Sequence, residues 1–232
     1  MTYFLVNENF PAEFCARLAP YGTCLPVPPF AALDFPVCAH PDMLAVNVGG
    51  ALFVYAEHTE LRELLEKHGI PFRTVSHKAG KLYPADVGLN LFTVGKLLFA
   101  NEKYTSREVI DFAKEQGFTL VNVRQGYAKC SVMPVDGAIV TADAGICKAA
   151  RAHGIETLLI TPRYVDIEKY DTGFIGGASG TLCEGKVCVF GDLYSHPYGE
   201  KICAFARAHG TTVENLGSGA LFDYGGFVRV NT

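Results

Sequence analysis

Glycines that recur at regular intervals constrain the fold of this chain more than any other feature of its sequence. One series marks the turn of a short apolar hairpin, and its members stand 41 to 48 residues apart. A second series of glycines ends helical segments and also has five members. The hairpin series is Gly50, Gly95, Gly137, Gly185 and Gly226, and the helix-ending series is Gly22, Gly69, Gly117, Gly154 and Gly210. Periods of this length are typical of propeller-like or solenoid repeats. Both series therefore predict five copies of one structural unit.

The unit is clearest between Tyr127 and Pro162, where apolar runs, a turn and a small-residue helix follow one another. Asp-Gly between two apolar runs is a strong hairpin signal, and glycine after a helical pattern is a common C-cap. In order we expect strand Ser131–Val135, turn Asp136–Gly137, strand Ala138–Ala142, helix Ala144–His153 and strand Thr157–Ile160. A strand-strand-helix-strand unit of this size cannot bury its own faces, so each copy needs neighbours.

The fifth unit is divided between the two ends of the sequence. Its hairpin, Gly219–Val230, comes last, whereas the helix and strand that should follow it come first, as Glu8–Tyr21 and Thr23–Val27. A closed ring explains this arrangement, because closure removes exposed sheet edges, whereas an open solenoid needs distinct polar caps. We therefore expect a single α/β domain over residues 1–232, with Tyr3–Val6 paired to Phe227–Val230.

Composition restricts the class of protein. The formal charge is −4 with no block of Lys or Arg, so we expect no nucleic-acid partner. Without an apolar run of about 18 residues or a basic, apolar leader, we expect neither membrane insertion nor secretion. Eight cysteines without close pairs suggest reduced thiols in the cytoplasm. Cys38 to Asp42 contains metal-ligating residue types but no second ligand pair, so we expect no metal and no cofactor.

Several motifs are similar to an uncharacterised bacterial family that is placed in the pentein, or guanidino-group modifying enzyme, fold. They are HPDM at His40–Met43, GYAKCS at Gly126–Ser131, GFIGGASG at Gly173–Gly180, GDLYSHP at Gly191–Pro197 and LFDYGG at Leu221–Gly226. The resemblance covers nearly the whole chain. It implies an α/β propeller of five ββαβ modules with the fifth module split, as in arginine deiminases, dimethylarginine hydrolases, agmatine deiminases and amidinotransferases.

The same resemblance implies a site in the central channel, where the first strand of each module delivers its leading residues. Active members of the fold use a Cys thiolate that attacks the guanidinium carbon, a His that moves protons, and two carboxylates that hold the cationic group. Their Cys leads the first strand of the last module. That position falls near Gly217 to Phe222 here, and no cysteine lies beyond Cys203.

Cys130 is the alternative nucleophile, because it precedes the first strand of the third module and because Lys129 beside it can lower its pKa. The other interpretation is that Cys130 is a small buried hydrophobe. By the approximate symmetry of the repeat, the residues equivalent to Cys130 are Asp42 or Met43, Asn90, Ser179 and Asp223. We expect these side chains around one pore.

The histidines divide into two groups. His68, His153 and His209 each precede a helix-ending glycine, where a cation meets the negative end of the helix dipole, so we interpret them as structural. His196 and His40 are the candidate proton carriers, although Ser195-His196-Pro197 is also an ordinary helix start. The candidate carboxylates are Asp42 together with one of Asp143, Asp192 or Asp223.

Two classes of function stay open on this basis. The first is a thiol-dependent hydrolase or amidinotransferase-like enzyme that acts on a small cationic substrate of the guanidine or amidine type. The second is a non-catalytic ring that binds a small molecule or a protein partner. In either case we expect the Pro-rich segment Leu25–Asp42 and the Gly173–Gly180 loop to border the mouth of the pore, since long irregular segments in compact domains are commonly functional.

Overall fold

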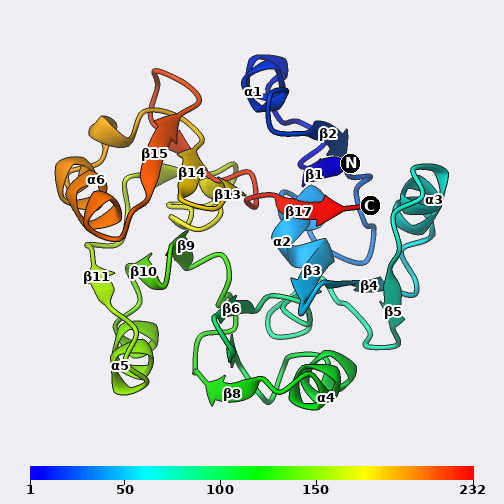
Figure 1. Cartoon of the computed structure of the whole chain (residues 1–232). Coiled ribbons are helices and arrows are strands. Elements are labelled where there is room, and N and C mark those ends of the chain that lie inside the picture. Colours follow the sequence, from blue (N-terminus) through cyan, green and yellow to red (C-terminus); the bar gives the residue numbers. More distant parts are fainter.

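A computed structural model describes all residues, 1–232, and shows five three-stranded sheets that repeat one pattern (Figure 1). In each sheet the first two strands are antiparallel and the third is parallel to the second. A helix connects the second strand to the third. This is the ββαβ unit that the glycine repeat predicts.

The elements of the four continuous units follow in chain order. The first has β3 (Ala45–Val48), β4 (Ala51–Tyr55), α3 (Thr59–Lys67) and β5 (Arg73–Val75). The second has β6 (Phe92–Val94), β7 (Leu97–Ala100), α4 (Arg107–Glu115) and β8 (Thr119–Asn122). The third has β9 (Val132–Val135), β10 (Ala138–Thr141), α5 (Ala144–Ala152) and β11 (Thr157–Leu159). The fourth has β13 (Ser179–Cys183), β14 (Lys186–Val189), α6 (Gly199–Ala208) and β15 (Thr212–Asn215).

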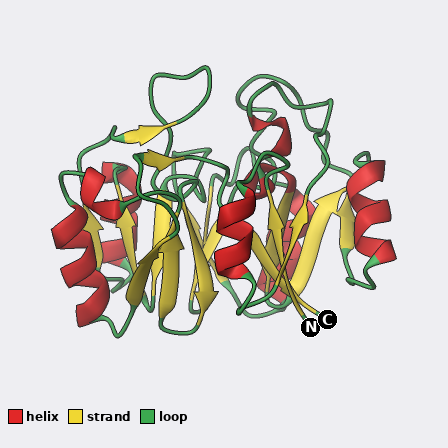
Figure 2. Cartoon of the chain, turned by 90° about the horizontal axis from the view of Figure 1, so that it is seen from above, coloured by secondary structure: helices red, strands yellow, loops and turns green.

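The fifth sheet combines the two ends of the sequence, as predicted. Its order is β17-β1-β2, with β17 at Val228–Asn231, β1 at Thr2–Val6 and β2 at Thr23–Pro26, and α1 (Ala12–Leu18) connects β1 to β2. Tyr3 pairs with Val230, and Thr2 pairs with Asn231. Figure 2 shows the two ends side by side at one edge of the molecule. The predicted pairing of Tyr3–Val6 with Phe227–Val230 is therefore confirmed.

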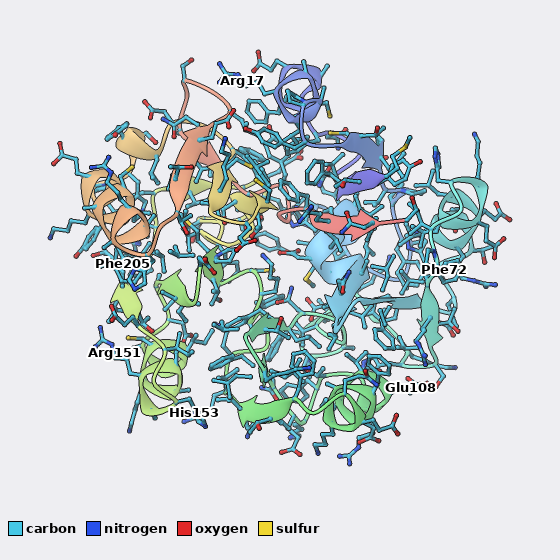
Figure 3. All side chains as sticks on the ribbon, viewed as in Figure 1. Arg17, Phe72, Glu108, Arg151, His153 and Phe205 are labelled. Atoms are coloured by element: carbon cyan, nitrogen blue, oxygen red, sulfur yellow. The ribbon has the colours of Figure 1, made fainter.

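The connecting helices α1, α3, α4, α5 and α6 lie on the outside, and the first strands of the sheets face inward (Figure 1). The labelled residues Arg17, Glu108, Arg151 and Phe205 all lie on the outer rim in Figure 3. His153 lies there as well, and its Nδ1 donates to the carbonyl of Ala149 at 2.9 Å, one helical turn earlier. The sheets and their helices thus form a mixed α/β fold whose interior is lined by strand backbone. No helix is both long enough and apolar enough to cross a membrane.

The glycines of the hairpin series have the backbone conformation that explains their repetition. At Gly95 and Gly137 the φ angles are +55° and +68°, in the left-handed region that side chains with a Cβ adopt only with strain. Nothing lies within 4 Å of a Cβ added at either position. Glycine is required there by the positive φ of the turn and not by close packing. The glycine series therefore marks hairpin turns whatever side chains surround them.

Two helices do not begin at the capping residue that the local sequence favours, which is Asn7 or Asn9 for the first and Thr105 for α4. The first helix begins after Pro11, and the side chain of Asn7 accepts a hydrogen bond from the backbone of Asn9 and does not cap the helix. In α4 the N-cap is Ser106 and not Thr105, and Glu108 binds the backbone and hydroxyl of Ser76 at 2.7 to 3.1 Å. In both cases a tertiary contact or an adjacent proline decides the boundary.

Short elements between the sheets organise the central region. A four-residue helix, α2 (Pro41–Leu44), leads directly into β3, and β12 (Val165–Asp166) pairs in parallel with β16 (Leu221–Phe222). Single 3₁₀ turns occupy Val37–Ala39 and Leu193–Ser195. The Pro-rich segment and the 163–178 segment meet where Lys169 Nζ donates to Asp34 Oδ2 at 3.1 Å and to the carbonyl of Phe35 at 3.0 Å.

Candidate active site

Five polar side chains that are far apart in sequence meet where the first strands begin. We call them the central cluster: His40, Asp42, Asn90, Cys130 and Asp223. All five are buried. Asp42 belongs to α2 just before β3, Asn90 precedes β6, Cys130 precedes β9, and Asp223 follows β16. The structure therefore brings together one residue from each of four repeat-equivalent positions, as the symmetry of the sequence predicts.

Asn90 connects three units of the fold. Its Nδ2 donates to the carbonyl of Asp42 at 3.1 Å and to Cys130 Sγ at 2.9 Å. Its Oδ1 accepts from the backbone N–H of Lys129 at 2.8 Å. A buried amide with its donors and acceptor in use holds a fixed orientation, because each unmade bond would cost the desolvation of that group. Asn90 thus fixes both the sulfur and the backbone that carries it.

Cys130 and Asp42 form the shortest contact between reactive groups. The thiol donates to Asp42 Oδ2 at 3.0 Å. Burial, followed by the negative charges of Asp42 and Asp223, raises the pKa of the Cys130 thiol well above its ordinary value, and the Asn90 hydrogen bond opposes this only in part. The sequence expectation that Lys129 lowers this pKa is wrong, because burial and the two carboxylates outweigh any nearby cation.

Asp42 is itself a perturbed acid. Burial, together with the charge of Asp223, raises the pKa of the Asp42 carboxyl to about 7, while Lys129 and the Cys130 thiol lower it. Its Oδ1 is buried and has no hydrogen-bond partner. An acid that titrates near neutral pH next to a thiol is suited to receive and return a proton.

Asp223 is held by backbone donors in a space that only glycine leaves free. Its Oδ2 accepts from the N–H of Phe174 at 2.8 Å, and its Oδ1 accepts from the N–H of Gly225 at 2.9 Å. A Cβ on Gly177 would lie 1.9 Å from Asp223 Oδ1. Gly177 is therefore required by this carboxylate, whereas a Cβ on Gly176 would meet the carbonyls of Lys129 and Cys130.

His40 contacts Asp223 and not the thiol. Its Nδ1 lies 3.8 Å from Asp223 Oδ1, and its ring packs against Gly225. Burial lowers the pKa of His40, while Asp223 raises it. No histidine side chain makes a hydrogen bond to Cys130, so the direct acceptor of the thiol proton in this structure is Asp42.

The central cluster separates two cavities. The pore cavity, about 410 Å³, runs between the first strands toward the hairpin turns, and Asp42 and Lys129 are among the residues that line it. The loop cavity, about 250 Å³, lies on the other side and is lined by His40 and Asp223 together with Pro36, Glu8 and Glu168. Both long loops therefore contribute to the surroundings of the cluster: the Pro-rich segment lines the loop cavity, and the Gly173–Gly180 loop packs on Asp223.

Four other candidate residues lie outside the central cluster. Asp143 caps α5 by accepting from the N–H of Ile146 at 2.7 Å, and Asp192 accepts from the N–H of Tyr194 at 3.0 Å. His196 Nδ1 accepts from the N–H of Tyr198 at 3.0 Å. Asp143 and His196 line a separate cavity of about 200 Å³. Ser179 is buried, and its hydroxyl donates to the carbonyl of Gly176 at 3.4 Å.

Two functional features were missed by the sequence argument. Arg229, on β17, lines the pore cavity, and the N–H of Phe174 binds Asp223. Side chains alternate between the two faces of a strand, and this alternation along β17 could have predicted that Arg229 lies on the inner face. The N–H of Phe174 could not be predicted, because every residue except proline has a backbone N–H. No group of three or more His, Cys, Asp or Glu side chains is arranged to hold a metal ion.

Solved structures with a similar fold include a dimethylarginine dimethylaminohydrolase and an amidinotransferase. A dimethylarginine dimethylaminohydrolase adduct with 4-chloro-2-hydroxymethylpyridine is 12% identical, covers 93% of this chain and 92% of its own, and has a TM-score of 0.54. A cysteine mutant of DDAH from Pseudomonas aeruginosa, complexed with citrulline, is 10% identical with 93% and 91% coverage and a TM-score of 0.51. SxtG, an amidinotransferase from Microseira wollei in the saxitoxin biosynthetic pathway, is 13% identical with 93% and 88% coverage and a TM-score of 0.49.

These similarities establish the fold as that of the pentein enzymes, and at this level of identity they establish the fold alone. Residues 5–228 match a family of unknown function (DUF6873), and the chain belongs to that family. No curated protein matches the sequence.

Proposed function

We propose that this protein is a thiol-dependent hydrolase or transferase that acts on a C–N bond of a small guanidine- or amidine-type substrate. The observation that carries the proposal is the contact of Cys130 Sγ with Asp42 Oδ2 at 3.0 Å, with Asn90 Nδ2 2.9 Å from the same sulfur. A thiol, a carboxylate with a pKa near 7 and an amide donor form the minimum set for nucleophilic attack with proton transfer.

The proposal includes one closed ring of five ββαβ modules, a single domain over residues 1–232. Strand β17 of the split module lies against β3 of the first module and against β13 of the fourth, and β13 also lies against β9. These contacts support closure through the fifth module. A ring places the leading residues of all first strands around one axis, which is the arrangement that the central cluster has.

A cationic substrate would supply the nearby positive charge that stabilises a Cys130 thiolate. The loop cavity carries Glu8, Glu168 and Asp223, and it contains no Lys or Arg among its lining residues. A guanidinium or amidinium group entering there meets Asp223 and approaches Asp42. Its positive charge stabilises both the Asp42 carboxylate and a Cys130 thiolate, because opposite charges nearby favour ionised forms. Substrate binding thereby lowers the pKa of the thiol in the step that needs the thiolate.

The reaction then proceeds with Asp42 as the base. The thiol proton moves to Asp42 Oδ2, and the sulfur electron pair forms a bond to the central carbon while the C=N π pair moves onto nitrogen. When the C–N bond to the leaving amine breaks, that amine takes the proton from Asp42. Water in a hydrolase, or an acceptor amine in a transferase, adds to the same carbon after giving its proton to Asp42. The C–S bond breaks, and the sulfur recovers the proton.

His40 has a positioning role in this scheme, since it packs beside Asp223 and not beside the sulfur. We assign no part in it to His196, Asp143 or Asp192, because none of them belongs to the central cluster and none contacts Cys130 or Asp42 through a hydrogen bond. Asn90 orients the thiol, and Ser179 supports the glycine-rich segment. The eight cysteines are free, which fits a reducing compartment such as the cytoplasm of a bacterium.

Affinity labelling tests the proposal. The protein is treated with a cationic haloacetamidine and, in parallel, with the neutral haloacetamide of the same shape, and the modified cysteines are mapped by peptide mass spectrometry. Faster modification of Cys130 by the cation, by at least about tenfold, is expected from charge attraction in a buried site. The remaining cysteines serve as internal controls and should show no such preference. Equal rates at Cys130, or modification of every accessible cysteine except Cys130, would refute the proposal.

The second candidate, a non-catalytic ring that binds a small molecule or a protein partner, is favoured by one observation. The pKa of the Cys130 thiol is raised, and no imidazole contacts the sulfur. In that case the Cys130→Ala variant should bind guanidine-type ligands as tightly as the wild type, and neither protein should turn them over. Loss of turnover with retained binding in the variant would instead support catalysis.

A further inference from the structure

The pore cavity has a regular wall that the proposed reaction does not use. One residue of each first strand lines it and is more exposed than its two chain neighbours: Asn47, Thr93, Pro134, Thr181 and Arg229. Side chains two residues apart share a face of a strand. The residues two positions nearer the central cluster, Ala45, Leu91, Val132 and Phe227, also line the cavity and are buried. The wall is therefore an apolar belt followed by a polar ring.

Arg229 carries the only charge in the polar ring. The other four members are Asn, Thr, Pro and Thr, and Arg229 forms no salt bridge and no side-chain hydrogen bond. The carboxylates of Asp136 and Glu184 belong to exposed hairpin turns at the mouth. Lys186 is occupied elsewhere, since its Nζ donates to Tyr21 Oη at 3.0 Å. The guanidinium thus presents free donors to the pore.

A second unpaired cation stands at the inner end of the same cavity. Lys129 is half-buried and forms no salt bridge, and its Nζ lies 3.7 Å from the position of a Cβ on Gly226. Gly226 and Arg229 are three residues apart in the chain, so their Cα atoms lie within about 10 Å of each other. Two cations that form no salt bridge therefore line the same cavity, Lys129 near the Asp42 end, where its charge lowers the pKa of Asp42, and Arg229 in the polar ring.

The geometry points to a second binding site in the pore cavity, for a linear dicarboxylate whose ends meet Lys129 and Arg229. The planar guanidinium accepts a carboxylate in bidentate fashion, and the ammonium binds the other end as a point charge. Methylene groups between the carboxylates would lie against Ala45, Leu91 and Val132. A cavity of about 410 Å³ has room for such a molecule.

Asp42 tunes this site through its unpartnered oxygen. Oδ1 is buried at the inner end of the cavity beside the carboxylate position. When Asp42 is ionised it repels an anion, and when it is protonated it can donate to one. Since the pKa of Asp42 is raised to about 7 by burial and by Asp223, dicarboxylate binding should tighten as the pH falls from 8 to 6 and should take up a proton.

Calorimetric titration tests the inference on the whole chain. Succinate, glutarate and adipate are compared with the monocarboxylate and the diamine of matching length, using wild type, Arg229→Gln and, as a control for net charge, Arg207→Gln on the outer face of α6. We expect the dicarboxylates to bind the wild type and the Arg207→Gln protein equally. The Arg229→Gln protein should bind them about 10-fold to 100-fold more weakly, the range for one lost charged hydrogen-bonding partner.

A second pair of variants separates charge from fold. Thr93→Glu places a carboxylate in the polar ring and should abolish dicarboxylate binding, whereas Thr93→Gln of equal size should retain it. Thermal unfolding checks that both variants fold. Equal affinity of the wild type and Arg229→Gln proteins, or tighter binding of the diamine than of the dicarboxylate, would overturn the inference. The labelling of Cys130 by a cationic reagent does not depend on Arg229, so the two proposals can fail separately.

Discussion

The two cavities that meet at the central cluster differ in both charge and construction. The loop cavity is acidic, with Glu8, Glu168 and Asp223 and no Lys or Arg, whereas the pore cavity has both signs of charge: the cations Lys129, Lys186 and Arg229 and the acids Asp42, Asp136 and Glu184. The first strands of the five sheets, each paired with one neighbouring strand, build the pore walls, and irregular segments joined by side-chain contacts build the loop cavity. One set of buried residues therefore faces an acidic cavity bounded by irregular segments and a cavity of mixed charge bounded by the first strands of the sheets.

The largest expected effect comes from a substitution in the glycine-rich segment, because this segment packs on Asp223, which lines the loop cavity. In Gly177→Ala the new Cβ would stand 1.9 Å from Asp223 Oδ1, so the buried carboxylate and its backbone donors must move. We expect a loss of about 4 kcal/mol in the free energy of unfolding, measured by urea denaturation. Gly219→Ala is the matched control, because nothing lies within 4 Å of a Cβ there, and it should be nearly neutral. Comparable stabilities of the two variants would show that the segment can relax.

The pH dependence of stability is the next largest expected effect. The pKa of Asp42 is raised from 3.8 to about 7 in the folded state by burial and by Asp223. The folded protein holds this proton where the unfolded chain releases it, so the contribution is fully present below about pH 4 and is lost as the pH rises through 7. Wild type should lose a few kcal/mol over that range relative to Asp42→Asn. Parallel slopes in urea denaturation at several pH values would contradict the assignment.

Removal of the Asp42 charge should also change the thiol. In Asp42→Asn the nearest negative charge and the acceptor of the thiol hydrogen bond are gone, so the pKa of Cys130 should fall. Neutral haloacetamide should then modify Cys130 about tenfold faster at pH 8. The preference for the cationic haloacetamidine should shrink in the same variant. A slower reaction with both reagents would mean that access to the sulfur, and not its charge state, limits modification.

The smallest expected effect concerns the contact between the two loops. Lys169→Ala removes the hydrogen bonds to Asp34 and to the carbonyl of Phe35. Because this pair is partly exposed, stability should fall by about 0.5 kcal/mol or less. Cationic labelling of Cys130 should nevertheless accelerate by about twofold as the loop cavity opens, while dicarboxylate binding in the pore stays unchanged. Lys148→Ala, on the exposed face of α5, is the control and should alter neither rate.

The sequence predicts the modules better than it predicts the chemistry within them, and particular residues show why. Gly95 and Gly137 recur because a hairpin turn needs a positive φ, which is a local requirement visible in residue type. The meeting of Asp42, Asn90 and Cys130 follows from the repeat, since equivalent positions lead equivalent strands. The raised pKa of the thiol could not be predicted, because it depends on burial and on through-space charges from two other modules.

The sequence also does not show whether a polar side chain binds a nearby backbone group or takes part in a distant site. Asp143 and Asp192 have the appearance of site carboxylates, but each stands before a helical turn and caps it. His196 looks like a catalytic histidine, and its ring nitrogen accepts from a backbone N–H two residues away. Pro11 sets the start of α1, although Asn7 and Asn9 are better capping residues. Asp143 and Asp192 also accept from the side chains of Gln125 and Asn215, so contacts outside the central cluster use both carboxylates.

The pairing of β1 with β17 has a consequence for the order of assembly. A ribosome makes β1, α1 and β2 first, yet their antiparallel neighbour β17 emerges only after the four continuous modules. Until then β1 exposes an unpaired edge, and Phe4 lacks Phe227, with which its ring packs at a centroid distance of 4.7 Å. Contacts between residues so distant in sequence are slow to form. The split module should therefore be the last to become protease-resistant during synthesis, and nascent chains that stall within the fourth module should remain open to association through that edge.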